Sequence, residues 1–137
     1  VVLNVVVEDR AGEIVARRGL QSRLFVPGNK PDRFAKALAS GADNVCIDLE
    51  DAVPAEQKVA AREAAMAAAA GDARLSIRIN AIATRAGLAD LLALADAAKR
   101  PALLFVPMVE SAAEIAIARS VLADPSVEFV PLIETVT

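Results

Sequence analysis

Five short hydrophobic runs follow one another along the chain after residue 20, and amphipathic segments separate them. The runs lie at residues 24–26, 45–49, 75–79, 103–106 and 129–133. Apolar runs of this length, bounded by turn residues, indicate buried strands, and their alternation with helical segments favours a parallel sheet. We therefore expect these five strands to pair in parallel, with the helices on the outside of the sheet.

Helix signals fill the intervals between the runs. Pro31 suits a first helical turn, and Gly41 suits the position just after a helix end. Two further helices are expected at residues 54–70 and 84–99. Ser111 and Glu114 form a capping box, which predicts the start of a fourth helix that ends near residue 124.

The first 20 residues follow a different pattern. Residues 1–7 are strongly strand-forming, residues 9–12 (D-R-A-G) indicate a turn, and residues 13–17 suit a returning strand. We predict a β-hairpin at residues 1–20. It is either the tail of a preceding domain or an addition to the main domain, which we place at residues 21–137.

Composition argues against several classes of protein. No run approaches the roughly 18 apolar residues that a membrane span requires, and the start shows no signal-peptide pattern. The net charge of −3, without Trp, Tyr or His, gives no basis for nucleic-acid binding. The single cysteine, Cys46, lies inside an apolar run, which excludes a disulfide framework and favours a cytoplasmic protein.

One basic residue interrupts the third predicted strand. Strand alternation places Arg78 and Asn80 on one face of that strand, with Ile77 and Ile79 on the other. A guanidinium at the carboxyl end of a strand suits a substrate carboxylate, because it can donate two parallel hydrogen bonds. The alternative is a structural ion pair between Arg78 and either Glu50 or Asp51.

Acidic and amide residues follow the other predicted strands. Asp48, Glu50 and Asp51 end the second strand, and three such charges cannot all be buried without an arginine or a proton. Glu134 ends the fifth strand, where a carboxylate is costly unless it is paired or metal-bound. Asn29 and Lys30, which follow the first strand, suit a phosphate group.

Two motifs carry a resemblance to a known family. The segment S-R-L-F-V-P-G-N-K-P at residues 22–31 and the segment D-L-E-D-A-V at residues 48–53 resemble the citrate lyase β-subunit/malyl-CoA lyase family, within the HpcH/HpaI aldolases. The resemblance implies a TIM (β/α)8 barrel, which needs about 250 residues. With 137 residues, the chain is expected to form an α/β fold that is a partial TIM barrel, its first five βα units.

The resemblance also implies roles for individual residues. Arg78 would bind the substrate carboxylate, and the I-E-T segment would make Glu134 the first Mg²⁺ ligand. The family's second ligand, an aspartate near the sixth strand, lies beyond the sequence. Glu50 would position Arg78, and the region of Asn29 and Lys30 would meet coenzyme A. Met108 stands where many citrate lyase β-like sequences carry a lysine, so the substrate is left open.

The implied activity is that of a Mg²⁺-dependent carbon–carbon lyase. It would act on an acyl-CoA thioester and a 2-oxo acid such as glyoxylate, oxaloacetate or pyruvate, in a homo-oligomer, a trimer or hexamer. The segment alone is expected to be inactive. Two alternatives stay open: a thioesterase using the same site, and a truncated scaffold or oligomerisation module. Residues 1–19 weakly resemble the end of a MaoC-like hot-dog domain.

Overall fold

The five predicted strands form one parallel sheet, in the order β3-β4-β5-β6-β7. The computed structural model describes residues 6–8, 14–16 and 22–134. Its strands are β3 (Arg23–Pro27), β4 (Asn44–Asp48), β5 (Leu75–Arg78), β6 (Leu103–Val106) and β7 (Glu128–Pro131). All four neighbouring pairs run parallel, which confirms the predicted pairing.

Among the described residues, four α-helices connect these strands. They are α1 (Phe34–Leu38), α2 (Lys58–Ala69), α3 (Arg85–Asp96) and α4 (Ala112–Leu122), and short 3₁₀ turns precede the first two. The side chain of Thr84 caps α3, and the predicted capping box of Ser111 and Glu114 is present at α4.

Helix α1 is shorter than the segment predicted from Pro31 to Gly41. The chain begins this segment with a 3₁₀ turn at Pro31–Arg33 rather than with an α-helical turn. Past the end of α1, the hydroxyl of Ser40 donates to the carbonyl of Ala37 at 2.6 Å. Such a local side-chain bond occupies a carbonyl that a continuing helix would use.

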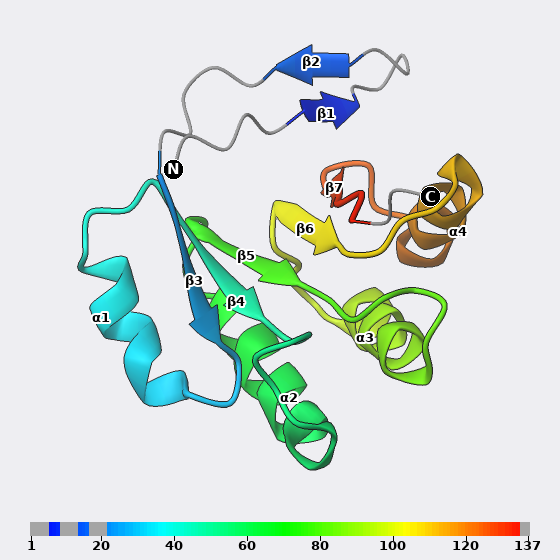
Figure 1. The fold of residues 1–137 in the computed structure, drawn as a ribbon. Coiled ribbons are helices and arrows are strands. Elements are labelled where there is room, and N and C mark those ends of the chain that lie inside the picture. The colour runs from blue at the N-terminus through cyan, green and yellow to red at the C-terminus, as the bar shows by residue number, and fades with distance from the viewer. Residues whose placement is uncertain (1–5, 9–13, 17–21, 135–137) are drawn as a thin grey trace.

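The sheet has two distinct faces. Figure 1 shows the helices on the outer side of the curving sheet, where Ile47, Ile77 and Leu104 pack in the same buried cluster as helical residues such as Ala65 and Leu91. The inner face carries a smaller cluster of Cys46, Leu103, Phe105 and Val130. Parallel strands with helices on the outside are the arrangement of a TIM barrel, and the chain forms the first part of one.

The predicted hairpin is present as a pair of short antiparallel strands. They are β1 (Val6–Glu8) and β2 (Ile14–Ala16), with Val7 opposite Val15. The predicted turn at residues 9–12 lies outside the described residues. The boundary between residues 20 and 21 stays a prediction.

Within the part of the chain that the structure describes, none of the helices has the length and apolar character required to cross a membrane.

Candidate functional site

A largely buried ion pair lies at the carboxyl edge of the sheet, where Asp48 ends β4 and Arg78 ends β5. These two residues face each other in register. The Nε and Nη2 atoms of Arg78 donate to the two carboxylate oxygens of Asp48, at 2.8 and 2.7 Å. Only 15% of the Arg78 side chain and 6% of the Asp48 side chain are exposed. The arginine is therefore fixed by a two-pronged ion pair before any ligand binds.

The environment of this pair shifts both pKa values in favour of the charged forms. Burial alone would raise the pKa of Asp48, but the hydrogen bonds from Arg78 and from the amides of Glu50 and Ala52 bring it below its usual value. The hydrogen bonds to Asp48 raise the pKa of Arg78, although burial opposes this. Both groups are thus charged at neutral pH.

The side chain of Glu50 lies beside this pair and forms an ion pair with Arg78, but no hydrogen bond. Its Oε1 atom is 3.5 Å from Nη1 of Arg78, an ion-pair distance rather than a hydrogen bond. Burial raises the pKa of Glu50 to about 7, against the pull of Arg78, and the charges of Asp51, Glu134 and Asp48 add to the rise. Asp48 therefore makes the hydrogen bonds that orient Arg78, while Glu50, the residue expected to position the arginine, forms an ion pair with it.

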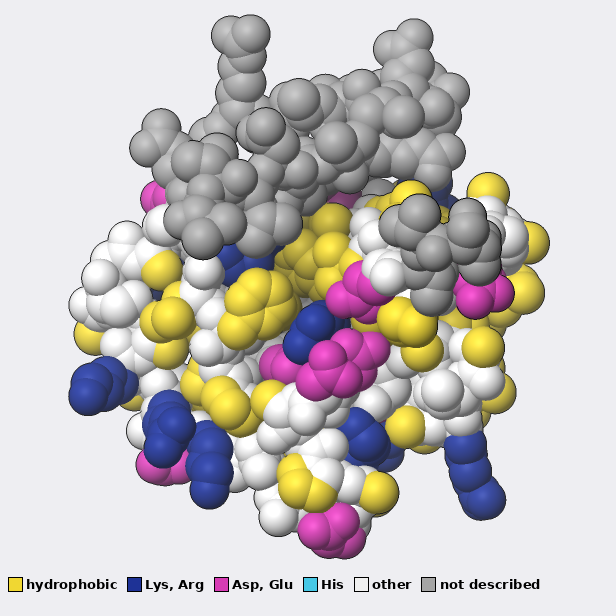
Figure 2. Space-filling model, in the orientation of Figure 1, with side chains coloured by type: hydrophobic (Ala, Val, Ile, Leu, Met, Phe, Trp, Pro, Cys, Tyr) yellow, Lys and Arg dark blue, Asp and Glu magenta, His cyan; other side chains and the backbone are white. Residues whose placement is uncertain are grey.

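Glu134 follows β7 and is exposed. Its Oε2 atom accepts a hydrogen bond of 3.3 Å from the amide of Met108, and its charge acts on Glu50. The fold thus brings Arg78, Glu50 and Glu134 to one edge from three strand ends. Figure 2 shows a basic side chain flanked by acidic ones near the centre of this face, with hydrophobic side chains around them.

An aromatic side chain adjoins the arginine. The Arg78 guanidinium lies over the ring of Phe25, 5.3 Å from its centroid. Phe25 lies on β3 and is 42% exposed. A cation over an aromatic face is attracted by the ring electrons, so this contact adds to the ion pair with Asp48 in holding the arginine.

Asn29 and Lys30 lie in the loop after β3, but the structure does not bring them into the group around Arg78. The Nδ2 atom of Asn29 donates to Oε1 of Gln57 at 2.6 Å, its Oδ1 atom is buried without a donor, and Lys30 is exposed. The preceding Gly28 is needed for close packing. A Cβ atom there would lie 2.8 Å from Cδ2 of Leu49.

The structure corrects the predicted orientation of Asn80. Strand β5 ends at Arg78, so alternation does not continue, and Asn80 turns toward the helices instead of sharing the arginine's face. Its Oδ1 atom accepts from Nζ of Lys58 at 2.6 Å, and its Nδ2 atom donates to Asp90 at 2.8 Å. Sequence reasoning missed Lys58 and Asp90. The only signal was the four-residue spacing of Lys58 and Arg62 on one helix.

The opposite end of the sheet contains a different set of polar contacts. Arg23 donates to Asn44 at 3.1 Å and stacks on Phe105, 4.3 Å from the ring centroid, while burial lowers its pKa. Burial raises the pKa of Cys46 to about 12, which leaves this thiol unreactive, in line with a packing role.

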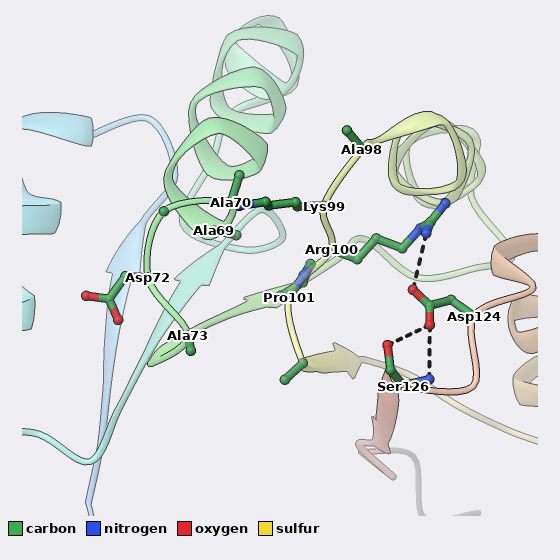
Figure 3. Close-up of a pocket in the computed structure, with 12 residues that line it drawn as sticks. Ala69, Ala70, Asp72, Ala73, Ala98, Lys99, Arg100, Pro101, Asp124 and Ser126 are labelled. Carbon is green, nitrogen blue, oxygen red and sulfur yellow. Dashed lines mark hydrogen bonds and ion pairs between the residues drawn. The ribbon is translucent and has the colours of Figure 1, made fainter.

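A hollow of about 430 Å³ also lies at this amino end, between the loops that lead into β5, β6 and β7. Figure 3 shows Arg100, Asp124 and Ser126 beside it, joined by hydrogen bonds. Active sites of TIM barrels form at the carboxyl ends of the strands, whereas the amino ends serve stability. The group around Arg78 is therefore the candidate active site.

The described residues supply only part of a metal shell. No group of three or more His, Cys, Asp or Glu side chains among residues 6–8, 14–16 and 22–134 is arranged to hold a metal ion. Glu134 and Glu50 nevertheless place two carboxylates at the same edge, where the charge of Glu134 helps to raise the pKa of Glu50. Such a pair fits a cation completed by water or by further ligands.

Comparison with known proteins agrees with this geometry. The family model described as HpcH/HpaI aldolase/citrate lyase matches residues 21–135. A citrate lyase subunit beta-like protein of Mycobacterium tuberculosis is 46% identical over 92 residues, which are 67% of this chain and 33% of that protein. An L-malyl-CoA/beta-methylmalyl-CoA lyase of Cereibacter sphaeroides is 38% identical over 98 residues, 68% of this chain and 31% of the relative.

A solved structure extends the comparison to three dimensions. The citrate lyase beta subunit of M. tuberculosis, complexed with oxaloacetate and magnesium, matches with a TM-score of 0.68 and 40% identity. The match covers 82% of this chain and 47% of that one. The chain thus spans less than half of the length of each of these relatives. It belongs to the HpcH/HpaI aldolase/citrate lyase family.

Proposed function

We propose that the full-length protein is a Mg²⁺-dependent carbon–carbon lyase. It forms or cleaves the bond between an acyl-CoA thioester and a 2-oxo acid such as glyoxylate, oxaloacetate or pyruvate. Family membership and the malyl-CoA lyase relative support the reaction class. The solved relative with oxaloacetate and magnesium supports the oxo acid and the metal. The present segment alone is inactive in this proposal, because it supplies five of the eight strands of a barrel.

The observation that carries the proposal is the state of Arg78. Asp48 occupies only two of its five N–H donors, and Nη1 makes no hydrogen bond to any described residue. The guanidinium therefore keeps free donors on the side that faces Glu50. A fixed, permanently charged group with free donors can bind a carboxylate and the negative charge that develops in an enolate, without reorganising during the reaction.

Glu134 is the residue that holds Mg²⁺ in this proposal. Mg²⁺ takes one or two protein carboxylates and otherwise water and substrate oxygens, so one exposed carboxylate near a second one suits it. When bound, the ion polarises the carbonyl group of the oxo acid as a Lewis acid. A second carboxylate ligand comes from the remainder of the barrel.

Glu50 is assigned the handling of a proton. Its carboxyl group lies beside the guanidinium that binds the substrate carboxylate, and a carboxyl group in that position can give or take a proton. Its Oε1 atom faces Nη1 of Arg78 at 3.5 Å, so a proton taken or given there acts next to the bound carboxylate.

Asn29 and Lys30 are assigned to coenzyme A. Lys30 is exposed in the loop that follows β3, and a lysine ammonium binds phosphate as a point charge. Asn29 is tied to Gln57, with its Oδ1 atom directed into a buried position that lacks a donor. The Asn29 side chain therefore joins the loop after β3 to Gln57, next to Lys30.

The assembly state belongs to the same proposal. Leu88 and Leu92 are 50% and 61% exposed one turn apart on α3, and Ile117 and Val121 repeat the pattern on α4. Apolar side chains in neighbouring pairs favour association between copies of the protein. We therefore propose a homo-oligomer, and we propose a cytoplasmic location because the single cysteine, Cys46, lies inside an apolar strand.

The experiment that tests this proposal is a product assay of the full-length protein. Acetyl-CoA or propionyl-CoA is incubated with glyoxylate, oxaloacetate or pyruvate, with Mg²⁺ or with EDTA, and products are identified by mass spectrometry. A condensed acyl-CoA that forms only with Mg²⁺ supports the lyase. In a second incubation, malyl-CoA is the only substrate. Release of free coenzyme A without formation of glyoxylate then indicates a thioesterase. Absence of turnover with every pair indicates a scaffold.

A further inference from the structure

One half-buried cation, Lys58, bridges the ends of the two strands that carry the candidate site. We infer that Lys58 is a positioning residue, which holds Glu50 and the end of β4 in place for the chemistry proposed above. This inference rests on the proposed function for its kinetic part. Its structural part concerns the loop after β4 and is testable without substrate.

The ammonium group of Lys58 has no donor left for a ligand. It donates to the carbonyl of Leu49 at 2.9 Å, to the carbonyl of Glu50 at 3.1 Å and to Oδ1 of Asn80 at 2.6 Å. An ammonium has three N–H donors, and these three acceptors use all of them. Lys58 therefore acts through the residues that it holds, rather than on a substrate.

The two carbonyls are those on either side of Glu50. The Leu49 carbonyl belongs to the same planar peptide group as the Glu50 amide, and that amide donates to Oδ1 of Asp48 at 2.9 Å. Lys58 thus holds one side of this peptide while Asp48 holds the other. The next peptide group is held through the Glu50 carbonyl. Both backbone torsions of Glu50 are therefore fixed between an ammonium and the carboxylate that orients Arg78.

The third acceptor couples this loop to the next strand. Asn80 follows Arg78 by two residues, and its orientation is set by Asp90, whose Oδ2 atom accepts from both the amide and Nδ2 of Asn80 at 2.8 Å. The other Asp90 oxygen accepts from Nε of Arg62 at 2.7 Å. Asn80 and Asp90 are 5% and 0% exposed. Because Nδ2 is bound, Oδ1 of Asn80 is the atom that faces Lys58.

The alternative is that Lys58 only stabilises the fold. A second cation of the chain, Arg100, serves as a matched control for this alternative. Arg100 is a half-buried cation that also donates to two consecutive carbonyls, those of Leu94 and Ala95, at 2.7 and 2.5 Å. Its third partner is Asp124 at 3.2 Å. Arg100 and Asp124 lie beside the loops that lead into β6 and β7, at the amino end of the sheet rather than at its carboxyl edge (Figure 3).

The test compares Lys58→Met with Arg100→Met in the full-length protein. Hydrogen–deuterium exchange is measured on peptides that cover residues 49–53, together with melting temperature and steady-state kinetics. Both variants should melt earlier than the wild type. Only Lys58→Met should exchange faster at residues 49–53, and only it should lose kcat/KM, by about 10- to 100-fold, mostly in kcat, since small misplacements of reacting groups cost about this much.

Equal exchange at residues 49–53 in the two variants would overturn the inference, as would turnover of Lys58→Met equal to that of Arg100→Met. If Lys58→Met does not fold, Lys58→Gln takes its place under the same criteria. A wild type without lyase activity would remove the proposed function instead. In that case the exchange comparison alone decides whether Lys58 holds the loop.

Discussion

Asp48 and Arg78 stand opposite each other on neighbouring parallel strands, and two hydrogen bonds of 2.8 and 2.7 Å join the carboxylate to the guanidinium. This pairing fixes the arginine through Nε and Nη2. It leaves Nη1 directed toward Glu50, at 3.5 Å from its Oε1 atom. The pair therefore has two consequences: it contributes to the stability of the sheet, and it presents a fixed cation at the carboxyl edge.

Replacing the carboxylate tests the first consequence. Asp48→Asn should lower the free energy of unfolding by about 1–3 kcal/mol, because Arg78 loses a charged partner at a largely buried position. Chemical denaturation of the full-length protein measures this change. Asp72→Asn is the control, since its pair with Arg74 is also 2.7 Å long but exposed. An equal, small effect in both variants would show that the buried pair contributes no more to the free energy of unfolding than the exposed pair does.

Glu50 predicts a pH dependence with a definite sign. Its folded pKa of about 7 lies above the ordinary 4.5, so the folded state binds more protons between these values. The contribution of Glu50 is fully present below about pH 4.5 and is lost as pH rises through 7. Glu50→Gln cannot lose a proton, so its melting temperature relative to wild type should increase from pH 5 to pH 8.

The measurement is a melting series with EDTA, so that no cation offsets the carboxylate charge. Asp48 contributes in the opposite direction in both proteins, because its pKa is lowered and its stabilisation is lost only as pH falls through that value. It therefore cancels in the comparison. A difference between Glu50→Gln and wild type that stays constant from pH 5 to pH 8 would contradict the assigned pKa.

Glu134 predicts a change in metal affinity. In the full-length protein, Glu134→Gln should bind Mg²⁺ at least about tenfold more weakly, since even residues that only support metal ligands commonly cost this much. Calorimetric titration with Mg²⁺ measures the affinity. Glu110→Gln removes the same charge from another exposed position after β6 and should bind as the wild type does. Equal affinity in wild type and Glu134→Gln would remove Glu134 from the metal site.

The fold was predictable because its signals are local. Short apolar runs bounded by turn residues, such as the one at residues 103–106, favour buried strands. The capping box of Ser111 and Glu114 marks a helix start directly. The length of α1 was not predictable, because the segment starts with a 3₁₀ turn at Pro31–Arg33 and the hydroxyl of Ser40 bonds to the Ala37 carbonyl past the helix end.

The candidate site was predictable only as a set of residues, not as a set of pairs. The pattern places Asp48 and Arg78 at the ends of two consecutive strands. That they lie directly opposite each other depends on the register of these strands, which no local pattern encodes. Asn80 departs from alternation because β5 ends at Arg78. Lys58 reads in sequence as an ordinary surface lysine of a helix start. Its three acceptors come together only when α2 packs beside the ends of β4 and β5.

The most direct test of the central claim is the rate of Arg78→Lys in the full-length protein, measured with acyl-CoA, 2-oxo acid and Mg²⁺ below the melting temperature of both proteins. Lysine keeps the charge but offers a point donor where a fork is required. We predict a fall in kcat/KM of about 30- to 1000-fold, which corresponds to about 2–4 kcal/mol of lost transition-state stabilisation. Near-normal turnover with a lowered melting temperature would contradict the account, because it would make Arg78 only a structural partner of Asp48.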